Sequence, residues 1–180
     1  MKIGGFFIAL AFALAACSSA TQPREPAATT APAPAPSSTA TAPVMPAQAA
    51  EDSPEGAAAF VTYWVQVSNY AAATGDVTEL TRISSPDCTG CQKYIDLYRD
   101  TYEAGGYFKG GDWELGKLSV DVDGVTWFAT TSVTVARGTY LPSSEDDDEV
   151  GPQTTDVVTF AVSTSLPERS VSEIVLGDGR

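Results

Sequence analysis

Two cysteines at the start of a predicted helix are the sharpest chemical feature of the sequence. They stand three residues apart, in Cys88-Thr89-Gly90-Cys91. In an oxidising compartment such a pair forms a disulfide, and closing so short a loop stabilises a fold by only about 2 kcal/mol. The alternative is a redox motif, because a helix N-terminus lowers a thiol pKa. The sequence lacks the Trp-Cys start typical of thioredoxin-like sites, and the pair follows no strand of a βαβ unit. We therefore expect a structural disulfide between Cys88 and Cys91.

The third cysteine ends an apolar run that begins the chain. Lys2 precedes this run, which is shorter than the roughly 20 residues that a bilayer-spanning helix needs. The pattern is typical of a signal peptide over residues 1–16. Its end, Leu14-Ala15-Ala16-Cys17, resembles the lipobox of bacterial lipoproteins. The resemblance implies that Cys17 carries lipid and anchors the mature chain to the extracytoplasmic face of the cell membrane. An ordinary secretory peptide with an incidental cysteine is the alternative.

Residues 17–53 follow as a stretch rich in proline, alanine, serine and threonine, without an aromatic side chain. Such a composition buries too little apolar surface to offset the entropy lost on ordering. We predict a disordered tether between the lipid anchor and a folded domain over residues 54–180.

Charge and composition exclude several function classes. The formal net charge is −13, which disfavours nucleic acid as a partner. Histidine is absent, so a Ser-His triad and the commonest zinc ligand are absent too. The acidic run at 145–149 lacks the spacing of a calcium loop and is interpreted as a hairpin connection. We expect no metal and no cofactor.

The first half of the predicted domain has helical periodicity. Residues 54–75 form the first predicted helix, with Ser53 as its N-cap and Gly75 at its end. A short second helix is predicted over residues 77–83. Ser84 and Asp87, which flank Pro86, resemble a capping box that opens a third helix ending at Gly105-Gly106.

The second half changes to the alternation of strands. Asp123-Gly124 predicts a two-residue hairpin turn in which Val122 faces Val125 and Val120 faces Trp127. The second strand continues to Val135, a polar loop is predicted over residues 138–153, and two more strands over residues 154–164 and 171–176. Helices followed by antiparallel strands predict an α+β domain with its helices packed on one face of the sheet.

Several motifs together resemble a family of actinobacterial lipoproteins of unknown function. They are Phe60-x-x-x-Trp64, Asn69-Tyr70-Ala71, Thr74-Gly75-Asp76, Leu80, Cys88-x-x-Cys91 and Gly105-Gly106. The order of elements is similar to the nuclear-transport-factor-2-like cone, a fold with helices on a curved antiparallel sheet. That superfold includes enzymes, ligand binders and assembly modules, so the resemblance implies a fold and assigns no activity.

In such a cone the space between sheet and helices is the candidate pocket. Tyr63, Asn69, Tyr70 and Trp127 are the candidates to line it. The alternative for the tyrosines and the tryptophan is a place in the core, which is the commoner role of aromatic residues at helical spacing. The favoured hypothesis is a non-enzymatic module that binds an envelope protein or a small apolar ligand. The alternative is an isomerase- or cyclase-like enzyme, which requires a buried carboxylate with a raised pKa in that pocket.

Overall fold

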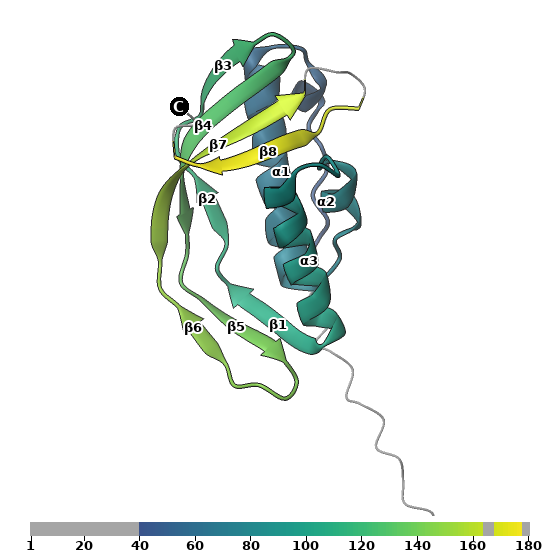
Figure 1. Ribbon diagram of the computed structural model, residues 1–180, viewed down its shortest axis with the longest axis vertical. Helices are drawn as coiled ribbons and strands as arrows, with labels where there is room; N and C mark the ends of the chain where they lie inside the picture. The colour runs from purple at the N-terminus through teal and green to yellow at the C-terminus, as the bar shows by residue number, and fades with distance from the viewer. Residues whose placement is uncertain (1–39, 164–167, 178–180) are drawn as a thin grey trace, which may run out of the picture. The chain divides into compact units, whose positions relative to one another are not determined.

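A computed structural model describes residues 40–163 and 168–177 of the chain. The predicted signal peptide, Cys17 and most of the predicted tether lie outside these residues. The described part contains one 3-10 helix, three α-helices and eight strands (Figure 1). Their bounds are η1 Ala47–Ala50, α1 Pro54–Thr74, α2 Thr78–Arg82, α3 Thr89–Glu103, β1 Gly105–Gly110, β2 Trp113–Leu115, β3 Ser119–Asp123, β4 Thr126–Val135, β5 Gly138–Ser143, β6 Glu149–Gly151, β7 Thr154–Ser163 and β8 Val171–Leu176.

Helix α1 begins and ends where the sequence predicts. The Ser53 hydroxyl accepts a hydrogen bond from the Gly56 N–H at 3.0 Å, and Pro54 occupies the first turn. Gly75 ends the helix in the left-handed conformation, with φ of 78°. A side chain there would also meet the Tyr102 ring, since a Cβ would lie 2.5 Å from its Cγ.

Helix α3 begins later than the predicted capping box. Cys88 is its N-cap, and the Cys88 sulfur accepts a hydrogen bond from the Cys91 N–H at 3.1 Å. The Ser84-Asp87 prediction was wrong because the backbone there serves another purpose. Ser85 N–H donates to the Val171 carbonyl at 2.8 Å, and Val171 N–H donates to the Ile83 carbonyl at 3.0 Å. This extended segment pairs with the start of β8 and therefore cannot enter a helix at Ser84.

The strands form two antiparallel sheets. The larger has the order β2-β4-β7-β8, and β3 pairs with β4 on the same side as β2. The smaller has the order β1-β5-β6. The helices lie on one face of the curved larger sheet, which is not closed (Figure 1). The α+β class with helices packed on antiparallel sheet is thus confirmed.

The smaller sheet was not predicted. Its strands β5 and β6 occupy the predicted polar loop over 138–153, and β1 occupies a segment without strand periodicity. The pairing of β1 with β5 explains why the sequence does not predict the smaller sheet. Phe108 faces Tyr140 across the strands, and the two rings stack with centroids 4.8 Å apart. These contacts join residues far apart in sequence, so local alternation does not reveal them.

The β3–β4 hairpin is present with a different register. Val122 faces Trp127 and Val120 faces Ala129, so the predicted partners of both residues were wrong by two positions. The reason lies in the turn. Gly124, with φ of 58°, comes first in the loop instead of second, a position that takes a positive φ in the two-residue turns of hairpins. Because the shift is even, the side chains keep the faces that the sequence predicts.

The core lies between α1 and the larger sheet. Its largest fully buried side chains are Trp64 and Phe60 from α1 and Phe160 from β7. The Trp64 indole N–H donates to the Ser84 hydroxyl at 2.9 Å, so even its polar atom is satisfied within the core. Trp64 thereby connects α1, the sheet and the segment before α3.

The folded unit starts before the predicted boundary at Pro54. Ala49 of η1 is buried in the core cluster, and its carbonyl accepts a hydrogen bond from Arg169 Nη1 at 3.0 Å. Only 3% of the Arg169 side chain is exposed, and burial lowers the pKa of its guanidinium. Ala49 and Asp52, assigned to the tether by composition, therefore both contact Arg169, which precedes β8.

Candidate ligand-binding groove

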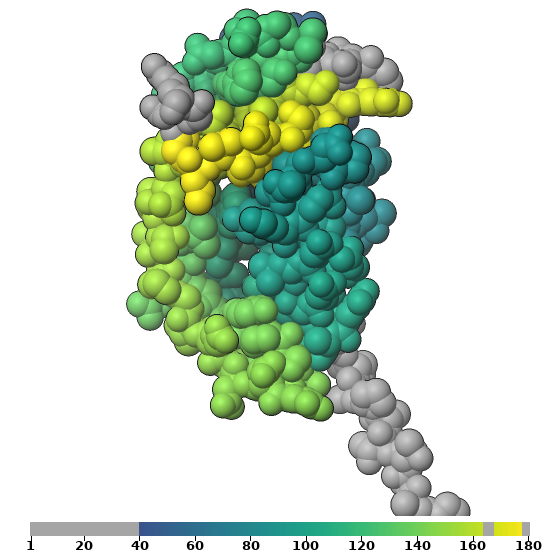
Figure 2. Space-filling view, in the orientation of Figure 1, coloured from purple at the N-terminus to yellow at the C-terminus, as the bar shows by residue number. Residues whose placement is uncertain are grey.

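An apolar groove lies between α3 and the sheets. Its first lobe, of about 220 Å³, is bounded by α3, β1, β2 and β5. Its second lobe, of about 340 Å³, is bounded by α3, β2, β7 and β8. Tyr94, Leu97 and Trp113 line both lobes, which are therefore adjacent. Figure 2 shows the surface hollowed between α3 and the strands on the left of the view, below β8.

Aromatic rings form the wall of this groove. The Trp113 ring meets the Tyr94 ring edge to face, with centroids 4.9 Å apart, and also contacts Trp64 in the core at 6.3 Å. Tyr98 meets Phe108 edge to face at 5.4 Å. A connected set of rings is stiffer than isolated side chains, since each ring restricts the rotamers of its neighbours. The wall is thus built on helix and strand residues that are held in place.

Asn69 positions Trp113 from α1. The Asn69 amide nitrogen donates to the Trp113 carbonyl at 3.0 Å, and the Trp113 N–H donates to the Asn69 amide oxygen at 2.9 Å. Both polar groups of the strand residue are thereby satisfied by one side chain. Asn69 was predicted to line the pocket; its place in the structure is behind the wall, where it fixes the residue shared by both lobes.

The groove carries little charge. Neither lobe is lined by an aspartate or glutamate among the described residues, and Lys93 of α3 is the only charged residue in the lining. Burial raises the pKa of the Tyr98 hydroxyl to about 12, so this wall residue is neutral at physiological pH. These properties suit an apolar ligand and offer no carboxylate base for proton abstraction.

The other three predicted pocket residues lie elsewhere, and none lines either lobe. Tyr63 is buried against α2, where its hydroxyl donates to Glu79 at 2.7 Å. Trp127 is half-buried on β4, and its indole N–H donates to Asp52 at 3.3 Å. Tyr70 is half-buried on α1, with its carbonyl accepting from the Thr74 hydroxyl at 2.7 Å. The structure does not bring these residues together.

The residues that the sequence missed are Tyr94, Leu97 and Trp113. Tyr94 belongs to the aromatic stripe of α3, which helical spacing assigns to the core. Trp113 belongs to a three-residue strand that follows Gly110-Gly111, too short for a periodicity signal. One signal in the sequence could have indicated an aromatic-lined site here. Residues 94–140 contain more aromatic side chains than the buried stripe of the helix accounts for.

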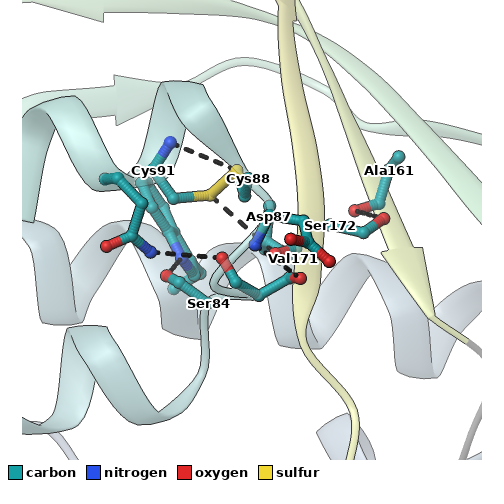
Figure 3. The surroundings of a disulfide bond; sticks show 10 residues. Ser84, Asp87, Cys88, Cys91, Ala161, Val171 and Ser172 are labelled. Atoms are coloured by element: carbon teal, nitrogen blue, oxygen red, sulfur yellow. Dashed lines mark hydrogen bonds between the residues drawn. A yellow bond between two sulfur atoms is a disulfide. The ribbon is translucent and has the colours of Figure 1, made fainter.

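The disulfide between Cys88 and Cys91 is present at the start of α3, beside Val171 (Figure 3). The two residues are 1% and 0% exposed, and Cys91 Sγ lies 3.8 Å from the Val171 carbonyl oxygen. The bond therefore closes the first turn of α3, and Cys91 lies against the start of β8. Thiol exchange requires access to a sulfur atom, and this burial favours a structural role over a redox one.

The acidic run lies in the β5–β6 connection, as predicted. Asp148 accepts a hydrogen bond from the Tyr107 hydroxyl at 2.7 Å, and Asp146 accepts one from the Ser143 hydroxyl at 2.6 Å. Two of its carboxylates thus accept hydrogen bonds from residues of the smaller sheet. Across residues 40–163 and 168–177, no helix is both long and apolar enough to cross a membrane.

Comparison with known proteins decides the family. Residues 25–164 match the pattern of a family described only as one of unknown function, and this is most of the chain. The chain belongs to this family, DUF6318. The predicted membership of an uncharacterised family is confirmed at that level, while the actinobacterial and lipoprotein assignments stay predictions. No curated protein matches the sequence.

Solved structures resemble the DUF6318 chain in fold. The intermembrane-space region of the chloroplast protein ARC6 is 16% identical, with a TM-score of 0.50 over 69% of this chain and 95% of that one. A protein from Novosphingobium aromaticivorans, described as NTF2-like with a cystatin-like fold, is 14% identical, with a TM-score of 0.37 over 67% of this chain and 79% of that one. At 16% identity the likeness to the ARC6 region concerns the fold alone.

Proposed function

We propose that this protein is a membrane-anchored lipoprotein whose extracytoplasmic domain binds an apolar ligand in the groove beside α3. The groove itself is the observation that carries the proposal. Its second lobe is about 340 Å³, within the range of roughly 300–1,000 Å³ usual for small-molecule sites. Leu97 and Leu176 contribute wall surface that is 40% and 77% exposed. Binding would cover this apolar surface.

A binding role is favoured over the isomerase- or cyclase-like alternative by the chemistry of the lining. That alternative needs a carboxylate inside the pocket whose pKa burial has raised. Glu79 is a described carboxylate with a shifted pKa, and the shift has the opposite direction. The hydrogen bond from Arg82 lowers this pKa. Glu79 contacts Tyr63 on the α2 side of α1 and lines neither lobe. No specific observation among the described residues therefore favours the enzyme.

Export is supported by the oxidised cysteine pair together with the sequence before residue 40. A disulfide persists in an oxidising compartment, whereas cytosolic thiols are kept reduced. The lipobox-like Leu14-Ala15-Ala16-Cys17 then supplies the anchor, and two acyl chains hold a protein stably on a membrane where one does not.

Ligand binding is tested with N-phenylnaphthylamine, an uncharged apolar fluorophore. The protein is the chain from residue 17 to 180 with Cys17→Ser, which contains every described residue and needs no detergent. We expect saturable binding, and at least a tenfold loss of affinity in Leu97→Glu. The substitution places a charge in the wall that both lobes share. Desolvating this charge costs more than roughly 1.4 kcal/mol, which corresponds to a tenfold change in affinity.

Val125→Glu is the matched control, because Val125 is 75% exposed in the β3–β4 turn and lines neither lobe. Its affinity should equal that of the parent chain. Equal losses in the two variants, or no saturable binding by the parent, would refute the groove as the site.

The anchor is tested by metabolic labelling with an alkyne analogue of palmitate in a bacterium that makes the full chain. Cys17→Ala should abolish both the label and recovery in the membrane fraction, because its thiol is the predicted acyl acceptor. The Cys88→Ser/Cys91→Ser variant should keep the label, since those sulfurs are buried. A label that persists in Cys17→Ala would remove the anchor from the proposal.

A further inference from the structure

One cation at the apolar groove has no ion-pair partner among residues 40–163 and 168–177. Lys93 is exposed on α3 and lines the second lobe next to Tyr94. No described carboxylate lies within ion-pair distance of its ammonium group, since the described ion pairs belong to Arg82, Arg99 and Arg169. The contrast with Arg99 on the same helix is clear, because Arg99 bonds both Asp96 and Asp100.

The setting makes this cation selective. The chain has 23 acidic and 10 basic residues, so its surface repels anions in general. The described residues that line the two lobes depart from that balance, with one lysine and no carboxylate among them. At this groove an anionic group meets a lysine and no described carboxylate of the lining, so electrostatic repulsion is weakest here. The rest of the ligand must then favour the apolar lobes.

The lobes supply that second part of recognition. Lys93 lines the second lobe together with Tyr94 and Leu97. Tyr94 and Leu97 also line the first lobe, so the apolar surface extends from one lobe to the other. A ligand with an anionic end at Lys93 can therefore extend an aliphatic chain past Trp113 toward Phe108 and Tyr140. The aromatic wall offers carbon surface for such a chain and no charge that it must desolvate.

We infer that the groove selects an amphiphile with one aliphatic chain and a carboxylate, whose charged end pairs with Lys93 and whose chain occupies the two lobes. This rests on the proposed function and adds the ligand class. A single ammonium matches the single charge of a carboxylate, and long Lys side chains place the charge in water while their stems cover apolar surface.

The experiment compares three ligands with the same twelve-carbon chain below their micelle concentrations: dodecanoate, dodecanol and dodecyltrimethylammonium. Each displaces N-phenylnaphthylamine from the Cys17→Ser chain over residues 17–180. We expect dodecanoate to bind about fivefold more tightly than dodecanol, the size of one exposed ion pair, and the ammonium ligand most weakly. The advantage should shrink in high salt.

Substitutions assign the preference to its residue. Lys93→Gln should bring dodecanoate to the affinity of dodecanol and leave dodecanol unchanged. Lys93→Glu should reverse the order of dodecanoate and the ammonium ligand. Lys117→Gln is the matched control, because Lys117 is exposed between β2 and β3 and lines neither lobe. It should retain the full preference for dodecanoate.

The outcomes separate this inference from the function beneath it. Equal affinity for all three ligands, or a carboxylate preference that survives Lys93→Gln, overturns the inference and leaves apolar binding in place. Failure of every ligand to displace the fluorophore, or failure of the fluorophore to bind, overturns both. Dodecyl phosphate is tested as a fourth ligand in the same assay, and tighter binding than dodecanoate would overturn the carboxylate assignment in favour of a phosphorylated headgroup.

Discussion

Trp64→Ala is expected to lower the free energy of unfolding by about 3–5 kcal/mol, the usual cost of removing a large aromatic side chain from a packed core. Trp64 is 0% exposed, and its ring lies 5.8 Å from Phe160 and 6.3 Å from Trp113. The substitution opens a cavity at the junction of α1 and the sheet. It also leaves the Ser84 hydroxyl without the indole N–H that it accepts.

Urea denaturation followed by circular dichroism measures this loss. Trp127→Ala is a control of the same residue type, because Trp127 is half-buried and bonds the exposed Asp52. It should cost about 1 kcal/mol. Trp64→Phe keeps part of the buried ring and should fall between the two. A cost below about 1 kcal/mol for Trp64→Ala would mean that the core is not organised around this residue.

Asn69→Ala is the second large effect, with an expected loss of about 3 kcal/mol. It leaves the N–H and the carbonyl of Trp113 without their partners, and each unmet partly buried group costs about 1–3 kcal/mol. Because Trp113 lines both lobes, the variant should also bind N-phenylnaphthylamine more weakly. Stability and binding are thus predicted to change together.

The same denaturation and fluorophore titrations check Asn69→Ala. Gln66→Ala provides the control on α1, because the Gln66 side chain is exposed and has no described hydrogen bond. Its cost should be within about 0.5 kcal/mol. Asn69→Asp keeps the acceptor for the Trp113 N–H and loses the donor to its carbonyl, so an intermediate loss is expected. If Asn69→Ala were as stable as Gln66→Ala, the amide would not hold the groove wall.

Helices and the longest strands could be predicted because their signals are local. Ser53, Pro54 and Gly75 mark the ends of α1 through cap chemistry that needs no tertiary contact. Alternation of Val158, Phe160 and Val162 marks β7, which is buried on the helix face. The start of α3 was misplaced, since the pairing of Ser85 with Val171 depends on a strand far along the chain.

The groove could not be predicted from the same signals. Its walls join α3 to strands of both sheets, and β1 pairs with β5 although residues 111–137 separate the two strands. Aromatic residues on α1 and β4 suggested a pocket, but the Tyr63 hydroxyl bonds Glu79 of α2 and the Trp127 indole bonds Asp52. Which aromatic side chains face a cavity depends on sheet curvature and strand order. Local periodicity of the sequence predicts neither of them.

The central claim is that the space between α3 and the sheets is a ligand site. The most direct test is a nuclear magnetic resonance titration of the Cys17→Ser chain over residues 17–180 with N-phenylnaphthylamine. We predict saturating shifts at the amides of Tyr94 and Leu97 and at the indole N–H of Trp113, with the indole N–H of Trp127 unchanged. Saturating shifts confined to Trp127 and the β3–β4 turn, or no saturating shifts at all, would contradict it.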